Sequence, residues 1–129
     1  MEAIFILLVE DEAAIQTMME AELIEAGFRV SIASRGKQAI TMLDSPEFGY
    51  RALVTDIHLG DDPVTGWDVA RHARELHPDL PVIYVTGGAA DEWASQGVPN
   101  SVLVTKPFAP SQIITAVSQL LNRGNAPVA

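Results

Sequence analysis

The sequence predicts a doubly wound α/β domain in which five parallel strands alternate with five helices. Short apolar runs recur along the chain, and stretches with apolar residues three or four positions apart separate them. The first run, residues 4–9, is apolar throughout, as expected for a strand that is covered on both faces of a parallel sheet. The length of 129 residues suits one domain that buries its own core.

The first half of the chain contains three strands and two helices. After the strand at residues 4–9 comes a helical stripe that ends at Gly27, a residue type that commonly ends helices. The apolar positions of that stripe are Ile15, Met18, Met19, Leu23 and Ala26. A second strand follows at residues 28–33, and a second helix stops near Pro46. Residues 52–55 form the third strand.

The second half continues the alternation. The third helix ends at the pair His77-Pro78, because a residue before proline disfavours the helical conformation. Residues 82–85 and 102–105 are the fourth and fifth strands, and a weak helical segment covers about residues 90–96. The last helix is predicted to end at Gly124. The sequence thus predicts one domain over residues 1–123 and a short tail over residues 124–129.

Right-handed crossovers between parallel strands leave few possible topologies. For five strands we predict the flavodoxin-like order 2-1-3-4-5. In such sheets, ligands bind beyond the carboxyl ends of the strands, at the switch point between strands 1 and 3. This rule places the functional site before any motif is considered.

Composition excludes several classes of function. Eight basic residues against seventeen acidic ones give a net charge of -9, which disfavours a nucleic-acid-binding face. The chain has no cysteine, so disulfides and thiol chemistry are excluded. No apolar stretch approaches the roughly 20 residues of a membrane span, and the start lacks the features of a signal peptide. We therefore expect a soluble cytoplasmic protein that binds neither nucleic acid nor membrane.

Polar residues follow the predicted strands at the end where the site should lie. Glu10 and Asp11 follow the first strand, Asp56 ends the third, Thr86 the fourth and Lys106 the fifth. Because neighbouring strands lie about 4.8 Å apart, these side chains should share one pocket. The carboxylates repel one another, and a hard divalent cation such as Mg²⁺ or Mn²⁺ would supply the counter-charge. Lys106 and the hydroxyl of Thr86 could then bind phosphoryl oxygens.

Each of these residues also has an ordinary structural explanation. Asp11 could be a helix N-cap, Asp56 a turn residue, and Lys106 part of a loop before proline. The Thr86-Gly87-Gly88 sequence could simply start a helix. We favour the functional interpretation because all four features fall at one edge of the predicted sheet.

The sequence resembles the receiver domains of two-component response regulators, and in particular a stand-alone receiver. The resemblance covers about residues 4–121 and depends on four short motifs in a fixed order. They are Leu-Val-Glu-Asp-Glu ending at Glu12, Val-Thr-Asp ending at Asp56, Val-Thr-Gly ending at Gly87 and Thr-Lys-Pro-Phe ending at Phe108.

The resemblance implies a role for each candidate residue. Asp56 would be the phosphoacceptor, and Thr86 and Lys106 would bind the phosphoryl oxygens. The metal would be held by Asp11 directly, by Glu10 mostly through water, by Asp56 and by the backbone carbonyl of His58. A cis Lys106–Pro107 bond is implied as well. The phosphodonor would be a histidine kinase or a histidine phosphotransfer protein. The domain would catalyse its own phosphorylation and dephosphorylation, and would signal by protein contact or phosphorelay to a downstream protein.

Three features depart from the family pattern. The segment from Asp56 to Gly66 is about two residues longer than usual, which reshapes a loop beside the metal site. Leu103 occupies the position where the family has a switching aromatic residue. The fourth helix is short, broken by glycine and proline. We therefore expect phosphorylation to act by ordering residues 87–100.

Two rival functions remain open at this stage. A phosphatase of the haloacid dehalogenase type also uses a metal and an aspartyl phosphate, but it needs a second Asp two residues after the nucleophile, where this chain has His58. A pseudo-receiver that only binds partners is the other alternative, and the complete set of polar residues argues against it.

Overall fold

The structure is a computed structural model that describes residues 3–45 and 49–125. All five strands pair in parallel in the order β2-β1-β3-β4-β5, which confirms the predicted topology. The strands are β1 (Phe5–Val9), β2 (Arg29–Ala33), β3 (Tyr50–Asp56), β4 (Val82–Thr86) and β5 (Val102–Thr105). The order reverses at β1 and β3, so their carboxyl ends form the switch point of the sheet.

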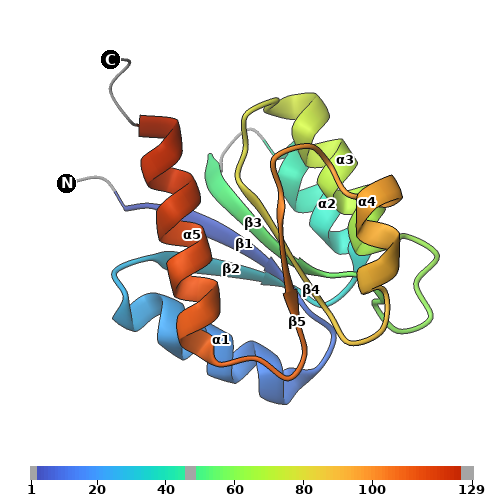
Figure 1. Ribbon diagram of the computed structural model, residues 1–129, viewed down its shortest axis with the longest axis horizontal. Helices are drawn as coiled ribbons and strands as arrows, with labels where there is room; N and C mark the ends of the chain where they lie inside the picture. Colours follow the sequence, from blue (N-terminus) through green and yellow to red (C-terminus); the bar gives the residue numbers. More distant parts are fainter. Residues whose placement is uncertain (1–2, 46–48, 126–129) are drawn as a thin grey trace.

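Helices cover both faces of this sheet (Figure 1). The helices are α1 (Ala13–Glu25), α2 (Gly36–Asp44), α3 (Gly66–Leu76), α4 (Trp93–Gln96) and α5 (Pro110–Asn125). Figure 1 shows α1 and α5 together on one face and α2, α3 and α4 on the other. Among the described residues, no helix combines the length and the apolar character needed to cross a bilayer.

Alternate residues of each strand feed two separate cores. In β1, Ile6 and Leu8 pack with the apolar residues of α1 and α5, whereas Leu7 and Val9 pack with those of α2 and α3. All four side chains are essentially inaccessible to solvent. This burial on both faces explains why the strand is apolar at every position rather than at every second one.

The strands are close to their predicted bounds, and the differences lie at element ends. Strand β3 begins at Tyr50, two residues before the predicted start. The exposed Arg51 interrupts the apolar run in the sequence, but the Tyr50 ring before it is buried. Helix α2 ends at Asp44; the predicted stop at Pro46 lies outside the described residues. The prediction that Gly124 ends the last helix is wrong, since α5 continues to Asn125.

The weak fourth helix is confirmed as a broken element. A 3₁₀ turn, η1 (Ala90–Glu92), precedes the single turn of α4. The chain leaves α4 at Gly97, where a Cβ atom would lie 2.5 Å from Cδ1 of Trp93. A side chain at this position would collide with Trp93, so glycine fits the point where α4 ends.

Candidate functional site

The carboxyl end of β1 supplies two acidic side chains with different environments. The backbone N–H of Glu10 donates to the carbonyl of Ala33 in β2, which prolongs the strand pairing by one residue (3.0 Å). The Glu10 side chain is buried, and its Oε2 accepts a hydrogen bond from the N–H of Glu12 (3.0 Å). Asp11 is exposed. The N-cap of α1 is Glu12, so the structure does not support Asp11 as a helix cap.

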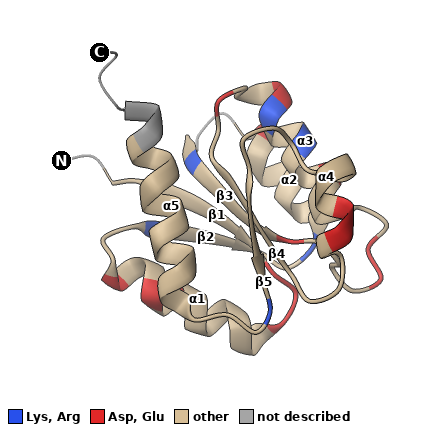
Figure 2. Cartoon of the chain, in the orientation of Figure 1, with Lys and Arg blue, Asp and Glu red and all other residues tan. Residues whose placement is uncertain are grey.

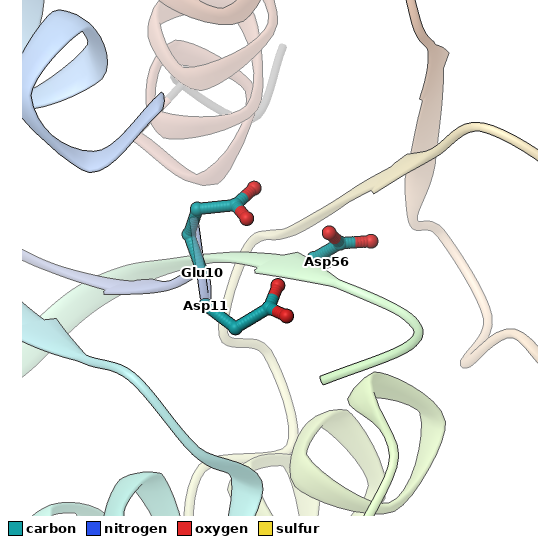
Figure 3. Close-up of side chains that lie close together, drawn as sticks. All are labelled: Glu10, Asp11 and Asp56. Carbon is teal, nitrogen blue, oxygen red and sulfur yellow. The ribbon is translucent and has the colours of Figure 1, made fainter. Parts of the chain in front are cut away.

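Asp56 is the last residue of β3 and lies next to this pair. Its side chain is 10% exposed, and its Oδ1 accepts a hydrogen bond from the N–H of Ile57 (2.7 Å). One carboxylate oxygen from each of Glu10, Asp11 and Asp56 lies within 4.8 Å of the others, and Figure 3 shows the three groups facing a common space. The predicted convergence at the switch point is therefore confirmed for these three residues.

Lys106 reaches this cluster from two strands away. Its Nζ lies 2.9 Å from Oδ2 of Asp56 and 3.5 Å from Oε1 of Glu10. Figure 2 shows the basic position beyond β5 beside the acidic segment between β1 and α1. The Lys106–Pro107 peptide bond is cis, as the resemblance implied. Burial lowers the pKa of the ammonium, but Asp56 and Glu10 outweigh that effect and the pKa lies above its usual range.

The charges of the cluster do not balance. Three carboxylates face one ammonium, and burial raises the pKa of Glu10 to about 7, with the charge of Asp56 adding to the effect. The N–H of Glu12 and the Lys106 ammonium oppose this rise only in part. Oxygen donors with surplus negative charge are the set that a hard divalent cation requires, so the residues present fit Mg²⁺ or Mn²⁺.

Thr86 is the last residue of β4, the strand that pairs with β3 next to Asp56. Its backbone carbonyl accepts a hydrogen bond from the N–H of Lys106 (2.8 Å), so the two predicted phosphoryl-binding residues are directly linked. The Thr86 hydroxyl accepts hydrogen bonds from the N–H groups of Gly88 (3.3 Å) and Ala89 (2.9 Å). Thr86 thus organises the turn after β4.

The loop after β3 carries two residues that sequence reasoning missed. The N–H of Gly66 donates to the carbonyl of Ile57 (2.8 Å), which joins the two ends of the loop. A Cβ at Gly66 would lie 1.9 Å from the backbone oxygen of Asp56. Further along the loop, Asp62 accepts hydrogen bonds from the N–H groups of Val64 (2.9 Å) and Lys37 (3.2 Å). The Asp62-Pro63-Val64 sequence, typical of Asx turns, was the available signal for this residue.

A cavity of about 670 Å³ lies between this loop and the start of α2. Asp11 lines one part of it, so the cavity adjoins the carboxylate cluster. The loop contributes residues 59–64 to the wall, the β2–α2 connection contributes Ser34 and Arg35, and the first turn of α2 contributes Lys37. The side chain of His58 is exposed.

Comparisons with known proteins agree with this fold. The family model for the response regulator receiver domain matches residues 6–118. The transcriptional regulatory protein CusR of Escherichia coli K12 is 31% identical over 94% of this chain, and the match covers 52% of CusR. The chain therefore belongs to the receiver-domain family of response regulators. It spans about half the length of the curated regulators that it matches.

Two solved structures extend the comparison. A response regulator receiver protein from Sinorhizobium medicae WSM419 is 50% identical, with a TM-score of 0.90 and coverage of 94% of this chain and 96% of that one. The receiver domain of the sensor histidine kinase PA1611 from Pseudomonas aeruginosa PAO1 is 28% identical, with a TM-score of 0.79 and coverage of 94% and 99%. That structure has a magnesium ion coordinated in its active-site cleft.

Proposed function

We propose that this receiver domain accepts a phosphoryl group on Asp56 and signals through protein contacts or by passing the group to another protein. The donor would be a phosphohistidine on a histidine kinase or a histidine phosphotransfer protein. The observation that carries the proposal is the ion pair between Lys106 and Asp56 inside the carboxylate cluster. The stand-alone arrangement, the downstream protein target and the cytoplasmic location stay predictions from the sequence.

The proposed reaction uses a carboxylate oxygen of Asp56 as the nucleophile. A P–O bond forms to this oxygen as the P–N bond of the phosphohistidine breaks, and the imidazole nitrogen keeps the electron pair and binds a proton. Lys106 is already in contact with Oδ2 of Asp56 and would remain close to the charge on the transferred group. Water attack on phosphorus would later release inorganic phosphate and restore the carboxylate.

The proposed metal ligands are Glu10, Asp11, Asp56 and the backbone carbonyl of His58. Glu10 would act mostly through water, because one of its oxygens already accepts from Glu12 and the other from Lys106. A bound divalent cation supplies positive charge that offsets repulsion between the carboxylates and the incoming phosphoryl oxygens. The magnesium ion in the cleft of the Pseudomonas aeruginosa receiver supports this assignment.

The proposal is tested by incubating the protein with Mg²⁺ and acetyl phosphate and measuring its intact mass. A receiver should gain one phosphoryl group that is lost on treatment with hydroxylamine, and chelation of the metal should prevent its formation. A pseudo-receiver would show no adduct. A phosphatase of the haloacid dehalogenase type would instead turn over phosphate esters, a role that the His58 position disfavours.

We predict that Asp11→Ala weakens Mg²⁺ binding more than Glu10→Ala does. Asp11 is exposed at the cluster and is proposed as a direct ligand, whereas both oxygens of Glu10 already have protein partners. Loss of a direct carboxylate ligand should raise the Mg²⁺ dissociation constant by about tenfold or more. Titration calorimetry without a phosphodonor measures both variants, and equal, unchanged affinities would refute the proposed ligand set.

The contacts of residues 87–100 narrow the expected phosphorylation switch to the first part of this segment. Residues 93–100 are held by the neighbouring structure: Arg74 donates to the carbonyl of Pro99 (2.7 Å), and the N–H of Val98 donates to the buried Tyr84 hydroxyl (3.1 Å). The start of the segment depends on the Thr86 hydroxyl, which accepts from Gly88 and Ala89. A change in the orientation of Thr86 should therefore affect residues 87–92 most strongly.

We predict that a beryllofluoride mimic of the phosphoryl group slows amide exchange in residues 87–92 by about tenfold, the equivalent of one hydrogen bond to a charged group. The mimic would hold Thr86 in place, and Thr86 holds the turn. Leu103, which is half-buried in β5, should show little change and serves as the internal control. Full protection of Gly88 and Ala89 before the mimic is added would contradict this switch.

A further inference from the structure

The loop between β3 and α3 is fixed to the rest of the domain at three points. At its base, the N–H of Gly66 donates to the carbonyl of Ile57. In its middle, Leu59 is buried in the core beneath α2 and α3. At its tip, the carboxylate of Asp62 connects the loop to α2. A compact surface loop with joined ends is an Ω-loop, and such loops are frequently functional.

The contact of Asp62 with α2 supplies a hydrogen-bond acceptor to a helix N-terminus that has no side-chain cap of its own. The N-cap residue of α2 is Arg35, and its side chain makes no capping hydrogen bond. Oδ2 of Asp62 accepts from the N–H of Lys37 in the first turn of α2, while Oδ1 accepts from the N–H of Val64 in the loop (2.9 Å). One carboxylate therefore caps the helix and closes its own turn. The N–H groups of Val64 and Lys37 hold its pKa below the usual range.

Steric contact reinforces this connection. A Cβ at Gly36 would lie 2.5 Å from the carbonyl oxygen of Val64 and 2.8 Å from its Cγ1. The backbone of α2 and the loop tip thus approach each other as closely as a glycine allows. We call Asp62, Val64 and Gly36 the loop latch.

The latch adjoins the carboxylate cluster. The loop forms one wall of the cavity of about 670 Å³, α2 begins the opposite wall, and Asp11 lines the same space. Gly60 adopts the left-handed conformation (φ +65°), and a Cβ atom built on it would lie 3.6 Å from Oδ2 of Asp11. A shift of the loop would therefore change the surroundings of Asp11.

We propose that Asp62 is a positioning residue that fixes the β3–α3 loop against α2 and so preorganises the metal site around Asp11 and His58. The inference rests on the proposed function, because it concerns the metal used in phosphorylation. Asp62 does not touch the metal in this account. It acts through the loop, as groups outside the ligand set commonly do in metal sites.

The test uses substitutions that break the latch in two independent ways. Asp62→Ala removes both acceptors, and Asp62→Asn retains one acceptor oxygen. Gly36→Ala leaves Asp62 intact but pushes Val64 away. Asp61→Ala is the matched control: Asp61 lines the same cavity and carries the same charge, but among the described residues its side chain makes no hydrogen bond.

Two measurements are made without any phosphodonor, namely amide exchange at Lys37 and Val64 and calorimetric titration with MgCl₂. Asp62→Ala should accelerate both exchange rates and raise the Mg²⁺ dissociation constant by about tenfold, at the low end of the range for groups outside the ligand set. Gly36→Ala should weaken Mg²⁺ binding similarly, and Asp62→Asn should fall between Asp62→Ala and the wild type. Asp61→Ala should leave the affinity nearly unchanged, because an exposed charge is screened.

Equal losses of affinity in Asp61→Ala and Asp62→Ala would overturn the proposal, since they would show a general effect of charge. Unchanged Mg²⁺ affinity in both Asp62→Ala and Gly36→Ala would overturn it as well. If the wild-type protein bound no Mg²⁺, the proposed function would fail instead. Faster exchange in Asp62→Ala would still support the latch in that case, and unchanged exchange would refute it.

Discussion

Replacing Asp56 with asparagine should abolish phosphorylation by acetyl phosphate while leaving the fold intact. The amide cannot supply the carboxylate oxygen that forms the P–O bond, and Asp56 is the only acidic residue in β3. The asparagine oxygen can still accept from the N–H of Ile57, which Oδ1 of Asp56 does now. Removing the charge also relieves the repulsion that contributes to the raised pKa of Glu10. We expect the free energy of unfolding to change by no more than about 1–2 kcal/mol.

Intact-mass measurement after incubation with Mg²⁺ and acetyl phosphate checks this expectation. Asp61→Asn is the control, because it removes an exposed carboxylate from the loop that follows β3. It should be phosphorylated at the wild-type rate. A full-occupancy adduct on Asp56→Asn would place the phosphoacceptor elsewhere and remove the basis of the proposed reaction.

Much of the fold was predictable because local sequence patterns indicate it. An uninterrupted apolar run at residues 4–9 indicates a strand covered on both faces, and β1 is covered by two distinct cores. The handedness of crossovers reduced the possible strand orders to a few, and the flavodoxin-like order predicted among them is the observed one. Element ends were less predictable. The end of α5 illustrates this, since Gly124 lowers helix propensity without preventing the helix from continuing to Asn125.

The convergence of Glu10, Asp11 and Asp56 was predictable for a similar reason. Each lies at the carboxyl end of a strand, and parallel neighbours end at the same edge of the sheet. Lys106 could be placed because its long side chain spans the width of one intervening strand, as the contact with Asp56 confirms. The strand pattern places these side chains but does not identify the metal or the phosphodonor. Those assignments are therefore proposals.

The Asx turn at Asp62 had a local signal, but the contact of Asp62 with α2 and the role of Gly66 were not predictable from local pattern. The contact of Asp62 with Lys37 joins residues that are 25 positions apart. The constraint on Gly66 comes from the backbone of Asp56, which reaches it only because the intervening loop folds back on itself. A glycine in the first turn of a helix is not unusual in sequence, so its steric role needs the fold to be known.

Gly66→Ala should be among the most damaging single substitutions in this protein. The new Cβ would lie 1.9 Å from the backbone oxygen of Asp56 and 2.9 Å from Cα of Ile57. Both contacts are with backbone, so no side chain can rotate to relieve them. The hydrogen bond from Gly66 N–H to the Ile57 carbonyl and the burial of Trp67 and Val69 in the core oppose a shift of the helix.

We expect Gly66→Ala to lower the free energy of unfolding by about 3 kcal/mol or more, the upper part of the range for overpacked sites. Denaturant unfolding measures this loss. Gly49→Ala is the control, since a Cβ there meets none of the described residues within 4 Å and should cost little.

The sign of the change in the free energy of unfolding separates two explanations for a glycine at position 66. If Gly66 were only a permissive residue in the first turn of α3, alanine would stabilise the helix by up to about 1 kcal/mol through its higher propensity. A loss of stability can then come only from the collision with the backbone of β3. The fraction that folds should also be phosphorylated poorly, because the clash displaces the carbonyl of Asp56 itself and with it the carboxylate that faces Lys106. Wild-type stability together with wild-type phosphorylation would show that β3 and α3 can separate, and that the close approach of Gly66 does not hold the site together.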